Sequence, residues 1–316
     1  MLRFILLRLV SALPVLLAVS FISFGVIWFV PGDPVSSVLD ASATPEEIAR
    51  VTAQLGLDGS PFDQLTAYYG RLLRGDLGQS ILLGQPVAEA IIERLPITLT
   101  LTLLSMAIAL STGLTLGIVA AVWHGSRLDQ TVMGVSLIGL SLPDFWFGLV
   151  LVFIFSVALG WLPTGGYVPL TEDPLGWVRA MLLPAFTLGT SQMALVARMT
   201  RSSMLEVLGQ DYIRTARAKG AGPIRVLLRH GLRNALVPVV TVAGLSFGLL
   251  LSGAVVIELV FSLPGMGRLI IGGVLRRDYP VIQGGLLFSA AIFVLVNVAV
   301  DILYGVLDPK ARARAT

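Results

Sequence analysis

Residues that could perform acid–base, nucleophilic or metal chemistry are few in this chain, and they do not form clusters. The 316 residues include no cysteine and only two histidines, His124 and His230. The lack of cysteine excludes disulfides, thiolate metal sites and cysteine nucleophiles. The sequence contains no Walker lysine motif, and Gly265-x-Gly267 precedes no phosphate-binding strand–helix unit. We therefore expect a chain that is not an enzyme, holds no metal or cofactor, and does not itself hydrolyse ATP.

Two acidic residues border or interrupt long apolar stretches. Asp144 follows Pro143 inside one stretch, and Glu258 closes another. An ionisable residue at membrane depth is a candidate for function by default. For Asp144 the alternative is a structural role, in which the carboxylate is hydrogen-bonded at the membrane boundary.

The largest concentration of charge is a basic segment, residues 198–235. It holds eight of the 22 basic residues of the chain and two acids, Glu206 and Asp211. Residues 211–220 predict a short helix, because Asp211 favours its N-terminus, Lys219 favours its C-terminus and Gly220 can take a left-handed cap. A short helix across the membrane surface can transmit force from a cytoplasmic motor. A solvated, lipid-facing basic loop has the same pattern.

Long apolar stretches must position these residues. The chain is 55% hydrophobic and 13% charged, against about 25% charged residues in soluble domains. A membrane-spanning helix needs about 20 apolar residues. The first stretch has no signal-peptide cleavage site, so we expect it to stay attached. The sequence predicts an all-α integral membrane protein with six transmembrane helices, at Leu9–Val30, Ile97–Trp123, Thr131–Ala158, Ala180–Ala197, Asn234–Ile257 and Tyr279–Val300.

The basic residues predict the orientation of these helices. With the N-terminus in the cytoplasm, the inner segments carry 14 basic residues and the short outer segments carry 4. The positive-inside rule therefore predicts that both termini are cytoplasmic. Because the basic residues lie mainly at helix ends, the net charge of +3 does not indicate a nucleic-acid partner.

The segment between the first two spans, residues 31–96, is too long to be a simple connector. A capping box at Thr44-Pro45-Glu46-Glu47, together with prolines and glycines, predicts helices within it. It is either a folded lid without further function or a docking or gating surface for a soluble partner. The predicted helices run from Thr44-Pro45 to Gly56, from Ser60-Pro61 to Gly75, and from Pro86 to Leu95-Pro96.

The basic segment resembles the "EAA" loop of bacterial ABC importer permeases, in which E-A-A is followed after three residues by glycine. Here Arg214-Thr215-Ala216 is followed by Gly220, with Arg214 and Thr215 in place of the first Glu and Ala. The run D-Y-I-R-T-A-R-A-K-G followed by H-G-L-R-N-A-L is similar to the dipeptide/oligopeptide/nickel subfamily. The resemblance implies a coupling helix that contacts an ATPase through Asp211, Tyr212, Arg214, Thr215, Ala216, Lys219 and Gly220.

Further segments, spread over nearly the whole chain, are similar to the same subfamily. They are Pro31-Gly32-Asp33-Pro34, Gly75-Asp76-Leu77-Gly78, Arg94-Leu95-Pro96, Ser141-Leu142-Pro143-Asp144-Phe145-Trp146, Glu258-Leu259-Val260-Phe261, Pro264-Gly265-Met266-Gly267 and Leu307-Asp308-Pro309. The long first outer segment favours the N-terminal-type member of the two permeases. Asp144 and Glu258 then become candidates for gating or for the translocation pathway.

The resemblance implies a type I ABC importer permease fold in the bacterial cytoplasmic membrane. The implied partners are a second homologous permease, two cytoplasmic ATPase subunits or domains that bind ATP and magnesium, an extracytoplasmic substrate-binding protein and the lipid bilayer. Di- or oligopeptides are the favoured substrate, with nickel, glutathione or another small solute as alternatives. A secondary transporter would need coupling charges and repeated halves, and a membrane enzyme would need a catalytic cluster. The expected regions are 1–30 (N-terminal segment and first span), 31–96 (outer helical loop), 97–309 (permease core with coupling loop 198–235) and 310–316 (cytoplasmic tail).

Overall fold

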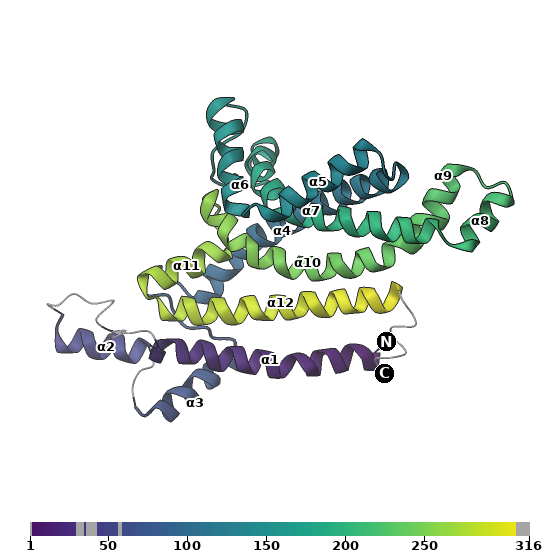
Figure 1. The fold of residues 1–316 in the computed structure, drawn as a ribbon. Helices are drawn as coiled ribbons and strands as arrows, with labels where there is room; N and C mark the ends of the chain where they lie inside the picture. The colour runs from purple at the N-terminus through teal and green to yellow at the C-terminus, as the bar shows by residue number, and fades with distance from the viewer. Residues whose placement is uncertain (1, 30–34, 36–42, 56–58, 308–316) are drawn as a thin grey trace. The chain divides into compact units, whose positions relative to one another are not determined.

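Helices account for the regular structure of the chain in its computed structural model, which describes residues 2–29, 35, 43–55 and 59–307 (Figure 1). The elements in chain order are α1 (Leu2–Phe29), α2 (Pro45–Leu55), α3 (Pro61–Leu72), α4 (Val87–Val122), α5 (Arg127–Ser141), α6 (Asp144–Leu151), the π-helix η1 (Val152–Ala158), α7 (Pro174–Leu208), α8 (Asp211–Ala218), α9 (Pro223–Arg225), the π-helix η2 (Val226–Leu232), α10 (Arg233–Val260), α11 (Met266–Arg276) and α12 (Tyr279–Leu307).

Helices long and apolar enough to cross a membrane number four among the described residues. They lie at Val87–Val122, Pro174–Leu208, Pro223–Val260 and Tyr279–Val300. A fifth span results if the bent pair α5–α6 is counted as one. Within α1 the apolar stretch Val10–Gly25 is shorter than a span. The structure thus confirms a helical membrane protein with several spans, but it does not confirm the count of six.

The third predicted span, Thr131–Ala158, is broken rather than straight. Helix α5 ends at Ser141 and α6 begins at Asp144, and the two parts meet at an angle of 107°. The cause is local, because a residue before proline is disfavoured in the helical conformation. Leu142, which precedes Pro143, accordingly has an extended backbone with ψ 132°. Pro143 was noted in the sequence analysis, but a break was not predicted there.

The helix predicted from Pro86 to Leu95-Pro96 does not end there. Helix α4 continues through Pro96 to Val122, so the outer segment and the second span share one helix of 36 residues. At 1.5 Å per residue it is about 54 Å long. A proline inside a helix removes one hydrogen bond. Burial of Ile91 before it and Leu101 after it offsets that loss, which sequence alone could not show.

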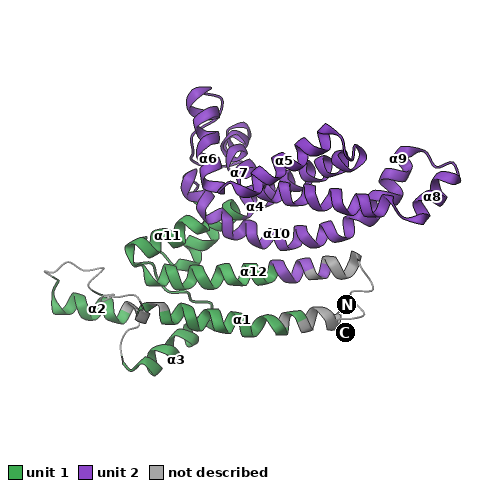
Figure 2. Cartoon of the chain, in the orientation of Figure 1, with its two compact units in different colours: residues 1–98, 264–295 green, residues 99–263, 296–316 purple. Residues whose placement is uncertain are grey.

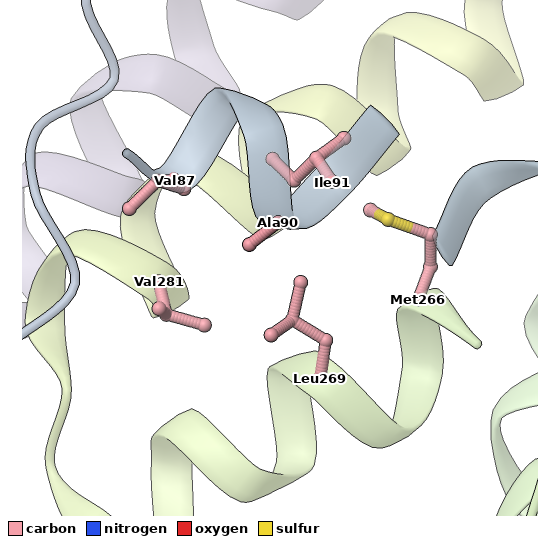
Figure 3. Packing of buried hydrophobic residues seen from close by; sticks show 6 residues of the cluster. All are labelled: Val87, Ala90, Ile91, Met266, Leu269 and Val281. Atoms are coloured by element: carbon pink, nitrogen blue, oxygen red, sulfur yellow. The ribbon is translucent and has the colours of Figure 1, made fainter. Parts of the chain in front are cut away.

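The chain divides into two compact units, of which unit 1 comprises Met1–Thr98 and Pro264–Leu295 (Figure 2). In its core, the start of α4 packs against α11 and α12 (Figure 3). The backbone N–H of Met266 donates to Thr98 Oγ1 at 2.9 Å. The loop before α4 is held as well, since Ser80 Oγ donates to buried Asp278 at 2.6 Å. The core residues are Val87, Ala90, Ile91, Met266, Leu269 and Val281.

A capping box begins α2 of unit 1, as the sequence predicts, and α3 begins at the predicted Ser60-Pro61 with a second capping box that was not predicted. Glu47 accepts a hydrogen bond from the backbone N–H of Thr44 at 2.9 Å, and Asp63 accepts from Ser60 in the same way at 3.1 Å. The backbone and hydroxyl of Thr44 hold the pKa of Glu47 below its ordinary value. The hydroxyl and then the backbone of Ser60 lower the pKa of Asp63. The stop predicted at Gly56 lies outside the described residues.

Unit 2 comprises Leu99–Leu263 and Val296–Thr316, and in it α7 packs closely on α4, α5 and α10 (Figure 2). The contact between α4 and α7 depends on glycine. A Cβ on Gly117 would lie 2.6 Å from the Ala197 carbonyl oxygen, and one on Gly189 would lie 2.7 Å from that of Ser105. Because glycine has no side chain, the backbones of these two helices can approach each other closely.

Candidate functional site

The basic segment forms the predicted short helix, α8, which follows directly on α7. Asp211 lies in its first turn and Lys219 is its C-cap. Gly220 has φ +82°, the left-handed conformation that glycine adopts without strain. The N–H of Gly220 donates to Arg217 O at 2.9 Å, and the N–H of Ala221 donates to Ala216 O at 3.1 Å. These bonds satisfy carbonyls at the end of the helix, so the predicted helix and its glycine cap are confirmed.

Helix α8 is fastened to the segment that leads into α10. Ile213 is fully buried beneath it. On the neighbouring turn, the Asn234 side-chain amide donates to Tyr212 Oη at 2.8 Å and to the His230 carbonyl oxygen at 3.1 Å. Tyr212 Oη also donates to that carbonyl at 3.3 Å. A movement of α8 would therefore pull directly on the start of α10.

The opposite face of α8 is exposed and basic. Arg214 and Arg217 are exposed, and Arg214 makes a surface ion pair with Asp211 at 3.5 Å. An open hollow beside the helix carries further positive side chains, which would attract an acidic surface of another protein. Figure 1 shows α8 and α9 beyond the ends of α7 and α10. The hollow is lined by Tyr212, Thr215, Ala216, Lys219, Gly220, Ala221, Arg225, Arg229 and His230.

The two acidic candidates lie on other elements of unit 2. Asp144 is the first residue of α6, is partly buried, and lines an open apolar hollow between α5, α6 and α7. Glu258 lies in the last turn of α10 and is fully buried. Its carbonyl oxygen accepts from the N–H of Leu263 at 2.9 Å and so closes the turn after α10. Asp144 therefore borders a hollow, whereas Glu258 is enclosed by protein.

An ion pair that the sequence analysis missed joins α5 to α7; its carboxylate is buried, and its guanidinium side chain is 23% exposed. Arg201 on α7 donates to both carboxylate oxygens of Asp129 on α5, from Nε at 2.5 Å and from Nη2 at 2.7 Å. The N–H of Gly125 donates to the same carboxylate at 2.9 Å, and Arg201 Nη2 lies 3.0 Å from His124 Nδ1. In the sequence, the only hint of this ion pair is that Asp129 and Arg201 each lie near an end of an apolar stretch.

The two histidines take part in different polar contacts. His124 contacts the ion pair, and His230 contributes its carbonyl oxygen to the anchoring of α8. Within the described part of the chain, no group of three or more histidine, cysteine, aspartate or glutamate residues could hold a metal ion.

Comparison with known proteins identifies the family. Residues 113–313 match the family described as "Binding-protein-dependent transport system inner membrane component". Residues 1–102 match its N-terminal counterpart, "Binding-prot-dependent transport system membrane comp, N-term". Together the two matches cover most of the chain.

Among curated proteins, a Brucella abortus (strain 2308) protein named for a peptide transport system permease is 49% identical over 308 residues, covering 98% of each chain. The dipeptide transport system permease protein DppB of Escherichia coli (strain K12) is 44% identical, covering 99% of each chain. The di/tripeptide permease DppB of Pseudomonas aeruginosa (strain UCBPP-PA14) is likewise 44% identical, with 99% of each chain covered.

Among solved structures, an inward-facing MetNI methionine ABC transporter shares the fold with a TM-score of 0.57 and 20% identity, over 70% of this chain and 97% of that chain. Its fold is that of the type I importer permeases. The sequence matches and the shared fold agree, and they decide against a secondary transporter. The chain therefore belongs to the family of binding-protein-dependent transport system inner membrane components, and it is a multi-pass membrane permease subunit of an ABC importer.

Proposed function

We propose that this permease translocates di- or oligopeptides across the bacterial cytoplasmic membrane, with α8 as the coupling helix. The support for the substrate class is the naming of full-length relatives, including the dipeptide permease DppB of Escherichia coli at 44% identity. Relatives named for nickel or glutathione would support the alternatives, but the three relatives described above are all named for peptides.

The observation that carries the coupling role is the construction of α8. It has one buried anchor, Ile213, and an exposed face rich in arginine. The N-terminal end of α8 follows α7, and near that same end Tyr212 contacts Asn234 at the start of α10. When ATP binding closes two ATPase subunits, a cleft in one of them pulls on α8. Because α8 is attached to both helices, α7 and α10 follow, and the access to the pathway changes sides.

The partners follow from this division of labour. The two ATPase subunits or domains bind ATP and magnesium, since this chain has no Walker lysine motif. A second homologous permease completes the pore. A substrate-binding protein delivers peptide to the outer segment, residues 31–96. Asp144, which lines the apolar hollow, and Glu258 are assigned to gating or to the pathway.

The orientation supports the same arrangement. The segments placed inside carry 14 basic residues against 4 in the short outer segments, so both termini and α8 are cytoplasmic. A membrane-impermeant thiol reagent applied to sealed inverted vesicles should label a single cysteine introduced at Ala218, and it should not label one introduced at Gly70 in the outer segment. The opposite labelling would contradict the orientation.

The test of the substrate class is uptake by the complete complex in proteoliposomes. The ATPases and ATP are placed inside the proteoliposomes, and the binding protein is added outside. A labelled dipeptide should then accumulate inside. Unlabelled di- and tripeptides should compete, whereas nickel ions and glutathione should not. Accumulation of nickel or glutathione without any uptake of peptides would overturn the proposal. The chain purified alone should hydrolyse no ATP, and hydrolysis by it would contradict the assignment of ATP to its partners.

A further inference from the structure

Asp129 and Arg201 make a fixed connection between the beginning of α5 and the last third of α7. The Asp129 side chain is 4% exposed, and both its oxygens accept from the Arg201 guanidinium. A bidentate arrangement of this kind fixes the angle between the two groups as well as their distance. His124 Nδ1 lies 3.0 Å from Arg201 Nη2 and adds a further contact to the guanidinium.

Helix α7 is in turn rigidly joined to α4. A Cβ on Gly113 would lie 2.8 Å from the Met193 carbonyl oxygen, and one on Gly117 would lie 2.5 Å from Thr200 Cβ. The two backbones are thus in contact along two successive turns, one turn before Arg201. Packed interiors of this density move as units rather than deform continuously. Helices α4 and α7 are therefore expected to move together.

Beyond the ion pair, α5 packs on α7 and borders an open hollow. The hollow lies between α5, α6 and α7, and its lining includes Val135 and Gly139 of α5 and Phe186 of α7. A Cβ on Gly139 would lie 3.7 Å from the Ala194 Cβ, so this part of α5 meets α7 in ordinary van der Waals contact. At its far end α5 stops at the Leu142–Pro143 break, where the chain turns by 107° into α6. One end of α5 is therefore fastened by the ion pair, while the rest meets α7 in van der Waals contact and borders the hollow.

We propose that the Asp129–Arg201 ion pair is the pivot about which α5 and α6 swing when the coupling helix moves α7. The proposal rests on the coupling role of α8. Arg201 lies seven residues before Leu208, the end of α7, or about 10 Å along the helix. A pull on α8 reaches the ion pair through this short rigid piece. Asp129, Arg201 and His124 are positioning residues in this mechanism, because they contact neither substrate nor nucleotide.

A disulfide between α5 and α7 tests the swing of α5 and leaves the side chains of the ion pair unchanged. A Cβ on Gly139 would lie 3.7 Å from the Ala194 Cβ, which is within the range of Cβ–Cβ distances in disulfides. The chain has no native cysteine, so the G139C/A194C variant carries a single engineered pair. Oxidation of the reconstituted complex should reduce peptide uptake at least tenfold, and reduction with dithiothreitol should restore it. The single variants G139C and A194C should be unaffected by the oxidant.

Charge variants test the pivot itself. In D129N and R201Q, the amount of peptide moved per ATP hydrolysed should fall at least tenfold, while ATP hydrolysis stays within about threefold of wild type. The double reversal D129R/R201D should recover part of that ratio. Arg198→Gln, on the exposed side of α7, is the matched control and should keep the wild-type ratio.

The outcomes separate the pivot from the proposed function. Normal peptide uptake by the oxidised G139C/A194C complex would overturn the swing of α5, even if the charge variants fail to assemble. If peptide uptake and ATP hydrolysis fall in proportion in D129N and R201Q, the ion pair is a structural contact and not a pivot. If the wild-type complex takes up peptide and the ratio in D129N is unchanged, only the pivot fails. If the wild-type complex takes up no peptide, the substrate proposal fails first.

Discussion

Gly220, which ends α8, offers the most direct test of the coupling helix. Its φ of +82° is a conformation that L-residues rarely adopt, although a Cβ there would meet nothing within 4 Å. The expected effect is therefore backbone strain without a clash. A left-handed helical backbone costs an L-residue about 1–2 kcal/mol, which changes a conformational equilibrium about 5- to 30-fold. The capped form of α8 should become that much rarer.

A graded series at this position makes the reasoning quantitative. Asn tolerates the left-handed conformation better than other non-glycine residues, so uptake should decrease in the order Gly, Asn, Ala, Val. Peptide uptake and ATP hydrolysis would be measured on reconstituted complexes. In Gly220→Val we expect a loss of coupled uptake, with membrane insertion retained, because the strain lies at the surface and outside the spans.

Gly222 is the matched control, two residues further along the same loop. A Cβ at this position would also meet nothing within 4 Å, but the backbone has φ −63° and ψ 156°. That extended backbone suits any residue before proline, and Pro223 follows. Gly222→Val should transport as wild type does. Wild-type uptake by Gly220→Val, or an equal loss in both variants, would refute the link between the left-handed cap and coupling.

Three further expectations concern stability. Gly117→Val should lower the stability of the complex in detergent by about 1–3 kcal/mol through overpacking, whereas Gly134→Ala, with nothing within 4 Å, should leave the thermal midpoint unchanged. Ile213→Ala, which empties a fully buried site, should weaken the anchoring of α8 by about 2–5 kcal/mol and speed hydrogen exchange in residues 211–218. Because the pKa of Glu47 is lowered in the folded protein, its contribution to α2 is present above its ordinary pKa and is lost as the pH falls through the lowered value. The protection of residues 45–55 against hydrogen exchange, corrected for the intrinsic pH dependence of exchange, should therefore fall on acidification, and it should not do so in Glu47→Gln.

Each expectation has an outcome that would contradict it. Equal thermal midpoints for the Gly117 and wild-type complexes would mean that α4 and α7 can separate at little cost. Unchanged exchange in α8 after the Ile213 substitution would show that the polar contacts of Tyr212 alone hold the helix. If the acid-induced loss of protection in residues 45–55 persists in Glu47→Gln, then the titration of another group causes it.

Much of the candidate site was predictable because its signals are local. The ends of α8 depend on Asp211, Lys219 and Gly220, which act on the backbone within one turn. The capping box predicted at Thr44 acts over three residues. The membrane class followed from the length of the apolar stretches, which the bilayer thickness sets.

The tertiary structure decided which faces meet. Asp129 and Arg201 are 72 positions apart, and no periodicity indicates that α5 and α7 bring them together. Likewise, whether Pro96 ends a helix or lies within one depends on the packing around it, and α4 continues because its neighbours bury both sides. The sequence by itself determined the helical membrane protein and the capped helix α8. Only the tertiary structure decided the continuation of α4 through Pro96, the anchoring of Tyr212 by Asn234 and the ion pair of Asp129 with Arg201, because these arise from contacts between helices rather than from rules that act within one turn.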